Sequence, residues 1–458
     1  MADFSTLTLN APLQRGLQEV GYVEMTAVQA ASVPAILAGR DVAAEARTGS
    51  GKTAAFALGI LSALNVLELR LQSLVLCPTR ELADQVSREI RRLARFIPNV
   101  KVLTLCGGVP LRPHLASLVH EPHIVVGTPG RILELLEKGV LPLARVKVLV
   151  LDEADRMLDM GFVDDLRLII AATPTERQTL LFSATISPDI RELGKQLQRD
   201  PLDVTVESAP DEVVIEQTFF EVEAEQKLDA LDSLLRVHRP ESVVVFCNTR
   251  IEVRTITAAL EGRRFSVLAI HGELEQRDRE EMLVRFANRS CTVLVASDVA
   301  ARGLDIANLP MVINYDVAND ADTHLHRIGR TGRAGREGLA LTLCAPSEIR
   351  RVNLIEDRLG KPLTWKPVPS AGGAKAPLLA PFMTLAVDAG RQDKLRPGDL
   401  LGALTGDARI PGTAVGKIDV FPTRTYVAIA REAADAALER LRAGKIKGRS
   451  FRIRRIGS

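Results

Sequence analysis

The stretch Ala46-Arg47-Thr48-Gly49-Ser50-Gly51-Lys52-Thr53 decides the fold, because it lies between an apolar run at 41–44 and a helix-forming segment. Its glycines let backbone N–H groups surround the phosphates of a nucleotide, Lys52 adds a positive charge, and the Thr53 hydroxyl can ligate Mg²⁺. A phosphate loop that joins a strand to a helix is typical of a parallel α/β fold. We therefore expect this stretch, from Arg47 onward, to bind a nucleoside triphosphate.

A second motif, Asp152-Glu153-Ala154-Asp155, ends the apolar run 146–151. That places two carboxylates at the carboxyl end of a predicted strand, where parallel α/β sheets hold their ligands. Asp152 is predicted to hold the metal ion through water, and Glu153 to orient or deprotonate the attacking water. Each motif alone could be structural and carry no function. Ala46 replaces the first Gly of the loop pattern, and an acidic tetrad is usually a solvated loop. Together, after strands and in this order, they predict nucleotide hydrolysis.

The composition is that of a globular protein with an uneven distribution of charge. The 458 residues are 46% apolar and 25% charged, and the formal net charge is +2. From residue 379 onward, fifteen Lys and Arg residues stand against eight Asp and Glu residues, a charge of about +7. We expect this end of the chain to anchor a polyanion.

The cysteines and the apolar stretches bear on the cellular location of the protein. The spacing of the five cysteines indicates neither a zinc site nor a disulfide framework, so we expect them to be reduced core residues. No signal peptide pattern is visible, and no apolar stretch approaches membrane-spanning length. We therefore expect a cytoplasmic protein with no membrane partner, and no obligate protein partner is evident. The cysteines are Cys77, Cys106, Cys247, Cys291 and Cys344.

Apolar runs followed by polar motifs and helix-forming segments divide the chain into three domains. The pattern predicts two tandem parallel-sheet domains at 1–206 and 213–362, because strands this apolar are buried on both faces. A linker is predicted at 363–380. Residues 381–458 follow the order β-α-β-β-α-β of RNA recognition motifs. Strands are predicted at 41–44, 74–77, 102–105, 124–126, 148–151, 180–182, 243–247, 267–270, 293–296, 312–315, 339–343, 383–387, 415–420, 426–429 and 451–456, and the last domain has predicted helices at 400–404 and 432–441.

Ten motifs in order closely resemble the DEAD-box family of ATP-dependent RNA helicases over residues 1–345. The resemblance implies two RecA-like domains, the cofactors ATP and Mg²⁺, and RNA-stimulated ATP hydrolysis with local unwinding of RNA duplexes. Besides the two motifs above, it rests on Pro78-Thr79-Arg80-Glu81-Leu82-Ala83, Gly107-Gly108, Thr128-Pro129-Gly130-Arg131, Ser183-Ala184-Thr185, Val245-Phe246-Cys247-Asn248-Thr249-Arg250, Gln276 with Arg279, Ala296-Ser297-Asp298 through Arg302-Gly303-Leu304-Asp305, and His326-Arg327-Ile328-Gly329-Arg330-Thr331-Gly332-Arg333.

The resemblance implies an adenine site near the N-terminus. Gln29 can pair with the adenine N6/N7 edge, as amide side chains do in nucleic-acid recognition. Phe4 lies seventeen residues before Gly21 and is similar to the family's aromatic residue that stacks on the base. Met25 stands where the family usually has Pro. The adenine ring is thus expected to lie between Phe4 and the Gln29 loop.

Other residues are implied to act in hydrolysis and its coupling to RNA. Arg330 and Arg333 resemble arginine fingers for the γ-phosphate, and their spacing of three predicts neighbouring positions on a helix turn. Asp305 is implied to contact the ribose or to assist domain closure. Ser183 and Thr185 are implied to link hydrolysis to RNA binding.

RNA is expected to be held by small polar residues at strand ends and helix starts. Hydroxyls, arginines and backbone N–H groups in these places grip phosphates without reading sequence. Ser297 stands where Thr is commoner and keeps the hydroxyl. The predicted contacts are Thr79, Arg80, Gly108, Thr128 and Arg131 in the first domain and Arg250, Gln276, Arg279 and Ser297 in the second.

The last domain resembles the C-terminal domain of the DbpA-type subgroup of this family. The resemblance implies that it binds a hairpin of 23S rRNA in the large ribosomal subunit precursor. Tyr426 fits the stacking signature of an RNA recognition motif, but Ala428 stands where Phe is usual. The basic residues are therefore expected to contribute more than stacking, unless they form only a solvated face. We call these residues the basic edge; they are Lys445, Lys447, Arg449, Arg452, Arg454 and Arg455.

Three other functions remain open on the sequence. The tandem scaffold also serves DNA translocases, although the Gln29 loop and the acidic tetrad argue against one here. An ATP-gated RNA clamp or assembly scaffold that unwinds nothing would share every motif. The last domain could also dock a protein instead of RNA.

Overall fold

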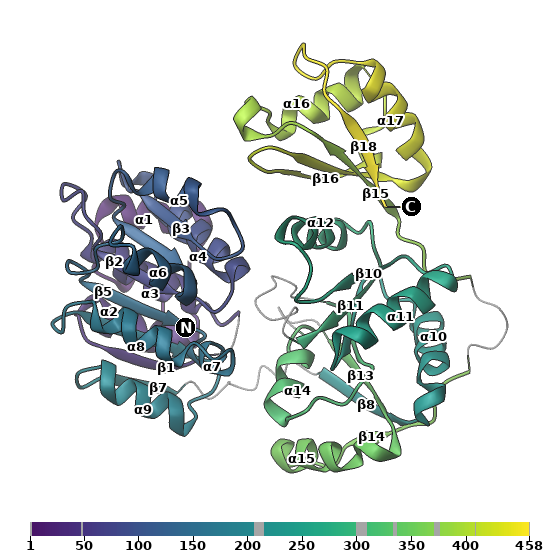
Figure 1. Cartoon of the computed structure of the whole chain (residues 1–458), viewed down its shortest axis with the longest axis horizontal. Coiled ribbons are helices and arrows are strands. Elements are labelled where there is room, and N and C mark those ends of the chain that lie inside the picture. Colours follow the sequence, from purple (N-terminus) through teal and green to yellow (C-terminus); the bar gives the residue numbers. More distant parts are fainter. Residues whose placement is uncertain are drawn as a thin grey trace. The chain divides into compact units, whose positions relative to one another are not determined.

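The computed structural model of the chain is shown in Figure 1. It describes residues 2–46, 49–205, 215–298, 309–332, 337–370, 376–407 and 409–457. The described residues up to Thr205 form one compact unit, and those from Ile215 onward form a second.

The first unit is built on a parallel sheet with the strand order β3-β4-β2-β5-β6-β1-β7 in its described part. Every residue of β2, β4 and β5 is buried, as expected for the centre of a sheet that is covered on both faces. The strands are β1 Val42–Glu45, β2 Ser73–Leu76, β3 Val102–Leu105, β4 Ile124–Gly127, β5 Val148–Asp152, β6 Gln178–Ser183 and β7 Leu202–Thr205.

Helices cover both faces of this sheet. Alternate residues of β6 enter two separate cores, because successive side chains of a strand point to opposite faces. Phe182 packs with Phe56 of α3 in one core, and Leu181 packs with Leu166 of α8 in the other. The helices are α1 Ala11–Val20, α2 Ala27–Leu37, α3 Lys52–Ala63, α4 Arg80–Leu93, α5 Leu111–Leu118, α6 Pro129–Glu137, α7 Ala154–Asp159, α8 Val163–Ala171 and α9 Pro188–Leu197.

The second unit begins with another parallel sheet. We call this sheet, together with its helices, domain 2. Its described strands follow the order β10-β11-β9-β12-β13-β8-β14. The strands are β8 Ile215–Glu221, β9 Val243–Cys247, β10 Val267–Ile270, β11 Val293–Ser297, β12 Met311–Asn314, β13 Gly338–Cys344 and β14 Thr364–Trp365. The helices are α10 Lys227–His238, α11 Arg250–Gly262, α12 Gln276–Ala287, α14 Ala321–Ile328 and α15 Ile349–Leu359.

The second unit ends in a smaller domain with an antiparallel sheet, which we call the C-terminal domain. Its strand order β16-β17-β15-β18 is that of a split βαβ fold, with both helices packed on one face. The tandem RecA-like sheets and the β-α-β-β-α-β domain predicted from the sequence are thus confirmed. The elements are β15 Phe382–Val387, α16 Pro397–Gly402, β16 Val415–Val420, β17 Thr425–Ala430, α17 Ala434–Ala443 and β18 Ile453–Ile456.

The sequence missed three strands at or next to the edges of the two large sheets. They are β7, β8 and the two-residue β14, and each has exposed positions. Short or polar edge strands lack the continuous apolar run that marks a buried strand. Strand β14 pairs with β8, so part of the predicted linker 363–380 belongs to the domain 2 sheet.

Three further findings concern the cysteines, metal sites and membranes. All five cysteines are buried and free, as expected from their spacing. The described residues contain no cluster of three His, Cys, Asp or Glu side chains that could hold a metal ion. Among those same residues, no helix is both long enough and apolar enough to cross a membrane.

Candidate nucleotide and RNA site

The phosphate loop follows strand β1 and ends where α3 begins at Lys52. Gly49 and Gly51 have φ angles of 88° and 90°, in the left-handed region that favours glycine. A Cβ added at Gly51 would also lie 2.4 Å from Nε2 of Gln29. Gly51 is the N-cap residue of α3 and offers no side-chain cap, so the first N–H groups of the helix can bind a phosphate. The predicted contacts Arg47 and Thr48 lie outside the described residues.

Lys52 brings the phosphate loop and the acidic motif together. Its Nζ lies 2.8 Å from Oδ1 of Asp152 and 3.7 Å from Oε1 of Glu153. All three side chains are buried. Burial acts to lower the pKa of Lys52, but the negative charges of Asp152 and Glu153 outweigh it and raise that pKa. Lys52 therefore stays cationic, which suits the binding of a phosphate group.

Glu153 occupies an uncommon backbone conformation at the start of α7. Its φ of 55° is left-handed, which for a residue other than glycine costs about 1 kcal/mol or more. Its Oε2 lies 2.7 Å from Nη1 of Arg156, which is also buried. Backbone conformations of this kind persist where the surroundings hold them, often at functional sites.

Two oxygen atoms near the loop suit a magnesium ion. Oδ2 of Asp152 is buried and has no hydrogen-bond partner within the described part of the chain. The Thr53 hydroxyl lies one residue beyond Lys52, in the first turn of α3. Mg²⁺ prefers oxygen ligands and typically takes only one or two from the protein, together with phosphates and water. The residues present therefore fit this ion.

Asp155 links the acidic motif to the end of β6, a role that sequence reasoning missed. Its Oδ2 accepts hydrogen bonds from the backbone N–H of Ala184 at 3.1 Å and from the hydroxyl of Thr185 at 3.4 Å. Its own N–H donates to Oγ of Ser183 at 3.2 Å. Ser183 and Thr185, the predicted coupling residues, thus contact the segment that carries Glu153. The only sequence signal was the position of Asp155 in the tetrad.

The two predicted adenine contacts, Gln29 and Phe4, both form contacts with other residues of the first unit. Gln29 accepts a hydrogen bond from the N–H of Thr26 at 2.8 Å and donates to the carbonyl of Gly51 at 3.0 Å. Phe4 is 5% exposed and stacks on Tyr22 with ring centroids 5.9 Å apart. Gln29 therefore lies against the phosphate loop. The adenine contacts of Phe4 and Gln29 stay predictions.

The predicted RNA contacts of the first unit gather at one edge of its sheet. They follow β2, β3 and β4, which are neighbours in the order β3-β4-β2, so their carboxyl ends lie together. Thr79 and Thr128 are the N-cap residues of α4 and α6. Gly108, with a φ of 74°, lies close to Arg80. Helix N-termini and hydroxyls side by side suit phosphate binding.

Arg131 is engaged within the protein. Its guanidinium donates to the carbonyl of Val109 at 2.7 Å, contacts Nδ1 of His114 at 2.7 Å and pairs with Glu134 at 3.0 Å. It is 8% exposed. These contacts order the loop around Gly108, so Arg131 supports that loop whether or not it also touches RNA.

Arg330 does not lie on a helix turn, which corrects the expectation from its spacing. Helix α14 ends at Ile328, and Arg330 follows in a turn in which Thr331 pairs with Leu309. Gly329 is the C-cap residue of α14, and three residues later Gly332 has a left-handed φ of 66°, which favours glycine. Arg330 itself is 6% exposed. The predicted contacts Arg333 and Asp305 lie outside the described residues.

Arg327, which sequence reasoning passed over, joins three strand ends of domain 2. It is 1% exposed and donates to both carboxylate oxygens of Asp298 at 2.6 and 2.7 Å. It also donates to the carbonyl of Asp316 and to Oδ1 of Asn248, each at 2.7 Å. Its carbonyl accepts the N–H of Arg330 at 3.2 Å. One buried guanidinium thus positions both the turn of the predicted arginine finger and the loops of the predicted RNA contacts.

Replacing Arg327 with Leu is expected to destabilise domain 2 by about 3–5 kcal/mol, because it leaves the carboxylate of Asp298 without its partner. Urea unfolding can be followed by the fluorescence of Trp365, the only tryptophan, which packs on Phe219 in this domain. The matched change at the exposed Arg350 should have little effect. Equal unfolding midpoints for both variants would contradict the positioning role of Arg327.

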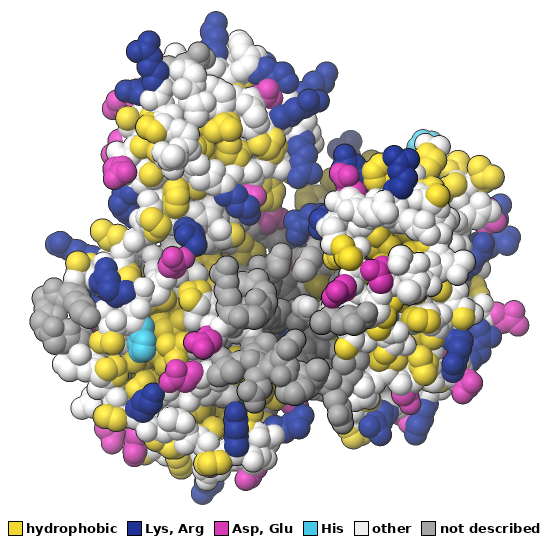
Figure 2. Space-filling model, turned by 180° about the vertical axis from the view of Figure 1, so that it is seen from behind, with side chains coloured by type: hydrophobic (Ala, Val, Ile, Leu, Met, Phe, Trp, Pro, Cys, Tyr) yellow, Lys and Arg dark blue, Asp and Glu magenta, His cyan; other side chains and the backbone are white. Residues whose placement is uncertain are grey.

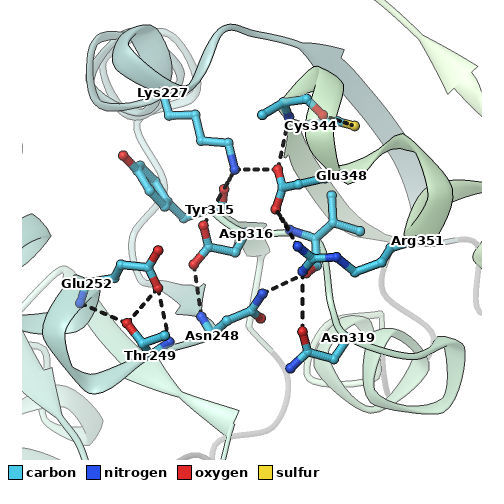
Figure 3. Close-up of polar contacts among 12 residues, drawn as sticks. Lys227, Asn248, Thr249, Glu252, Tyr315, Asp316, Asn319, Cys344, Glu348 and Arg351 are labelled. Carbon is cyan, nitrogen blue, oxygen red and sulfur yellow. Dashed lines mark hydrogen bonds and ion pairs between the residues drawn. The ribbon is translucent and has the colours of Figure 1, made fainter.

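A second buried network supports the same loops (Figure 3). Nζ of Lys227 lies 2.6 Å from Oε2 of Glu348 and 3.5 Å from Oδ1 of Asp316. Asp316 in turn accepts the N–H of Asn248 at 2.9 Å. Thr249 and Glu252 then form a capping box at the start of α11. The network fixes where β9 ends and α11 begins.

The predicted RNA contacts of domain 2 lie at the ends of β9, β10 and β11, which are neighbours in the sheet. Arg250, the first residue of α11, has a side chain that is 60% exposed, and it pairs with Glu273. Ser297 ends β11 and is 8% exposed. Arg279 lies in the first turns of α12, and the side chain of Gln276 is outside what the structure describes.

The basic edge of the C-terminal domain is largely exposed. Lys445, Lys447, Arg449 and Arg452 are exposed in the segment between α17 and β18. Figure 2 shows Lys and Arg side chains on the face of this domain that it presents. Arg454 is only partly exposed and pairs with Glu281 of α12 at 3.5 Å. The exposed side chains of Lys447 and Arg449 pair with Asp399 at 3.5 Å and with Asp393 at 3.7 Å. Tyr426 is buried.

Comparison with known families shows the class of protein. Residues 26–193 match the DEAD/DEAH box helicase family, residues 226–335 match the helicase conserved C-terminal domain, and residues 384–455 match the DbpA RNA binding domain. The chain therefore belongs to the DEAD-box family of ATP-dependent RNA helicases and is an RNA-dependent ATPase.

Individual relatives narrow the subgroup to the DbpA type. The chain is 52% identical over 455 residues to the ATP-dependent RNA helicase DbpA of Escherichia coli (strain K12), covering 99% of each chain. It is 34% identical over 475 residues to the protein of the same name in Bacillus subtilis (strain 168), again covering 99% of each. A solved structure of S. cerevisiae Dbp5 bound to RNA and ADP BeF3 matches with a TM-score of 0.73 and 27% identity over 80% of this chain and 96% of that one.

Proposed function

We propose that this helicase unwinds short RNA duplexes during assembly of the large ribosomal subunit, while its C-terminal domain holds a hairpin of 23S rRNA. The observation that carries the proposal is the basic edge, exposed on a separate small domain with a charge of about +7. The match of this domain to the DbpA RNA binding domain supports RNA as its ligand. We also propose domain limits at 1–206, 213–362 and 381–458 and a cytoplasmic location.

The proposed cycle uses the groups gathered around the phosphate loop. ATP and single-stranded RNA together favour closure of the two helicase domains, which brings Arg330 and Arg333 to the γ-phosphate. Glu153 orients or deprotonates the attacking water, and Lys52 binds the phosphates. Ser183, Thr185 and Asp155 connect this centre to RNA binding. Hydrolysis then favours reopening and release of the RNA.

Mg²⁺ is the proposed second cofactor. Asp152 and Thr53 would hold it, since both supply oxygen atoms near the phosphate loop. When bound, it supplies positive charge to the phosphate oxygens. The protein contributes a buried Asp152 carboxylate and a cationic Lys52 beside it.

The C-terminal domain supplies the selectivity that the helicase domains lack. The predicted contacts of those domains are hydroxyls, helix N-termini and arginines, which hold phosphates of any sequence. A folded hairpin presents a particular arrangement of phosphates, and a shaped basic surface can select it. The domain thus directs a sequence-blind motor to one region of RNA.

Reversing the charges of Lys445, Arg449 and Arg452 to Glu is expected to weaken binding of a 23S rRNA hairpin fragment and to flatten its salt dependence. The slope of log K against log salt should fall by about one unit for each phosphate that the variant no longer binds. The control reverses three exposed charges of the first unit, Arg70, Lys138 and Arg145, which gives the same net charge. A similar decrease in affinity in both variants would mean that net charge alone, and not the basic edge, attracts the RNA.

A further inference from the structure

The loop 107–110, which joins β3 to α5, carries one of the predicted RNA contacts and is held by the start of α6. The N–H of Gly107 donates to Oγ1 of Thr128 at 3.2 Å. The carbonyl of Val109 accepts a hydrogen bond from Nη2 of Arg131 at 2.7 Å. Thr128 and Arg131 therefore fix the backbone of this loop.

Helix α5, which follows the loop, packs lightly on the rest of the first unit. None of its eight residues, all of which the structure describes, is fully buried. Leu111, Leu115 and Leu118 are partly buried against the core. Segments with few buried apolar contacts open at a low cost in free energy. The position of the loop therefore depends on its polar contacts more than on the apolar packing of α5.

The side chain of His114 on α5 contacts the same arginine. Nδ1 of His114 lies 2.7 Å from Nη1 of Arg131. Because a guanidinium has only N–H donors, Nδ1 must accept this hydrogen bond, which requires a neutral ring with its proton on Nε2. Nε of Arg131 lies 3.0 Å from Oε2 of Glu134. Three segments thus hold the guanidinium, through His114 of α5, Glu134 of α6 and the carbonyl of Val109.

The charged groups that face His114 oppose a positive charge on its ring. Burial lowers the pKa of this half-buried histidine, and the positive charges of Arg131 and of Arg80 on α4 lower that pKa further. The negative charge of Glu134 acts to raise the pKa but does not outweigh them. The contact is therefore complete above the ordinary pKa of a histidine. It is lost as the pH falls through the lowered pKa, because a protonated ring has no acceptor.

We propose that His114 is a positioning residue for RNA binding, which holds Arg131 and the loop 107–110 in place only while its ring is neutral. Protonation turns His114 from a hydrogen-bond partner of Arg131 into a like charge beside it, so the affinity for RNA falls in acid. The proposal rests on the predicted RNA contacts Gly108 and Arg131. It is independent of the C-terminal domain and of the ribosomal target.

Binding of a single-stranded oligouridine to the full chain, with a non-hydrolysable ATP analogue present, tests the proposal between about pH 8 and about pH 5.5. His114→Asn places a carbonyl oxygen where Nδ1 lies and does not titrate. Over this range the affinity of the unaltered chain should fall about tenfold more than that of His114→Asn, the effect of losing one hydrogen bond to a charged group. His114→Leu has no acceptor, so it should bind about tenfold more weakly than the unaltered chain at the higher pH.

His120→Asn is the matched control, since His120 is exposed two residues beyond the end of α5, and this variant should keep the pH response of the unaltered chain. The NMR signal of the His114 ring, identified by its loss in His114→Asn, needs no RNA and should titrate below the ordinary range of a histidine. A ring that titrates in the ordinary range would overturn the proposal. So would equal pH responses of the unaltered chain and His114→Asn, or unchanged affinity in His114→Leu. A helicase with no preference for rRNA would refute the proposed function but leave these results, so the two failures are distinguishable.

Discussion

Arg330→Ala is expected to lower RNA-stimulated ATP turnover by about three orders of magnitude or more, the effect of losing an arginine finger. In the proposed cycle its guanidinium reaches the γ-phosphate only after domain closure, so it stabilises charge that develops during the reaction. The affinity for ATP in the absence of RNA should therefore change little. Steady-state turnover with saturating RNA, together with nucleotide titration, measures both quantities.

Two controls separate catalysis from folding in this variant. Arg330→Lys keeps the charge but loses the planar fork, so it should recover only part of the activity. Urea unfolding followed at Trp365 shows whether the turn after α14 remains intact. Full turnover in a folded Arg330→Ala protein would show that this buried arginine is structural.

Glu153→Gln is expected to retain ATP binding and to lose hydrolysis by about two to four orders of magnitude, the usual contribution of a general base. The amide keeps the shape of the side chain and can fill the same left-handed turn. It can no longer take a proton or carry the charge that faces Lys52 and Arg156. Because hydrolysis reopens the helicase domains in the proposed cycle, RNA should remain bound longer in the presence of ATP.

The dissociation rate of labelled RNA with ATP checks this prediction. Asp159→Asn, at the end of the same helix α7, is the matched control, since it makes the same chemical change away from the phosphate loop. Near-normal turnover in Glu153→Gln would remove Glu153 from the mechanism. Turnover reduced to the same degree in Asp159→Asn would point to a general weakening of α7.

The buried strands and the nucleotide motifs could be predicted from the sequence because their signals are local. Runs such as Val243–Cys247 are apolar throughout and lie at the centre of a sheet. The phosphate loop follows β1 and the acidic motif ends β5, and since only β6 separates these parallel strands, their carboxyl ends bring Lys52 and Asp152 together. The sequence did not predict edge strands such as β14, because two exposed residues carry no periodic pattern.

The parts of the site that the sequence did not reveal depend on long-range contacts. Arg327 and Asp298 are 29 positions apart, and nothing in their local pattern indicates that they pair. Arg454 looked like a phosphate contact until the fold placed Glu281 beside it. The stacking signature identified Tyr426 from the sequence, but it could not show that the fold buries the ring. Side chains with two possible partners are assigned only once the tertiary arrangement is known.

The basic edge is proposed to direct a sequence-blind motor to ribosomal RNA. Its most direct test is the ratio of ATP turnover stimulated by a 23S rRNA hairpin fragment to that stimulated by unrelated RNA of equal length and structure. We predict a ratio well above one for the unaltered chain and close to one for the variant with Lys445, Arg449 and Arg452 reversed, with unchanged turnover on unrelated RNA. Equal ratios for the two proteins would contradict this role of the basic edge.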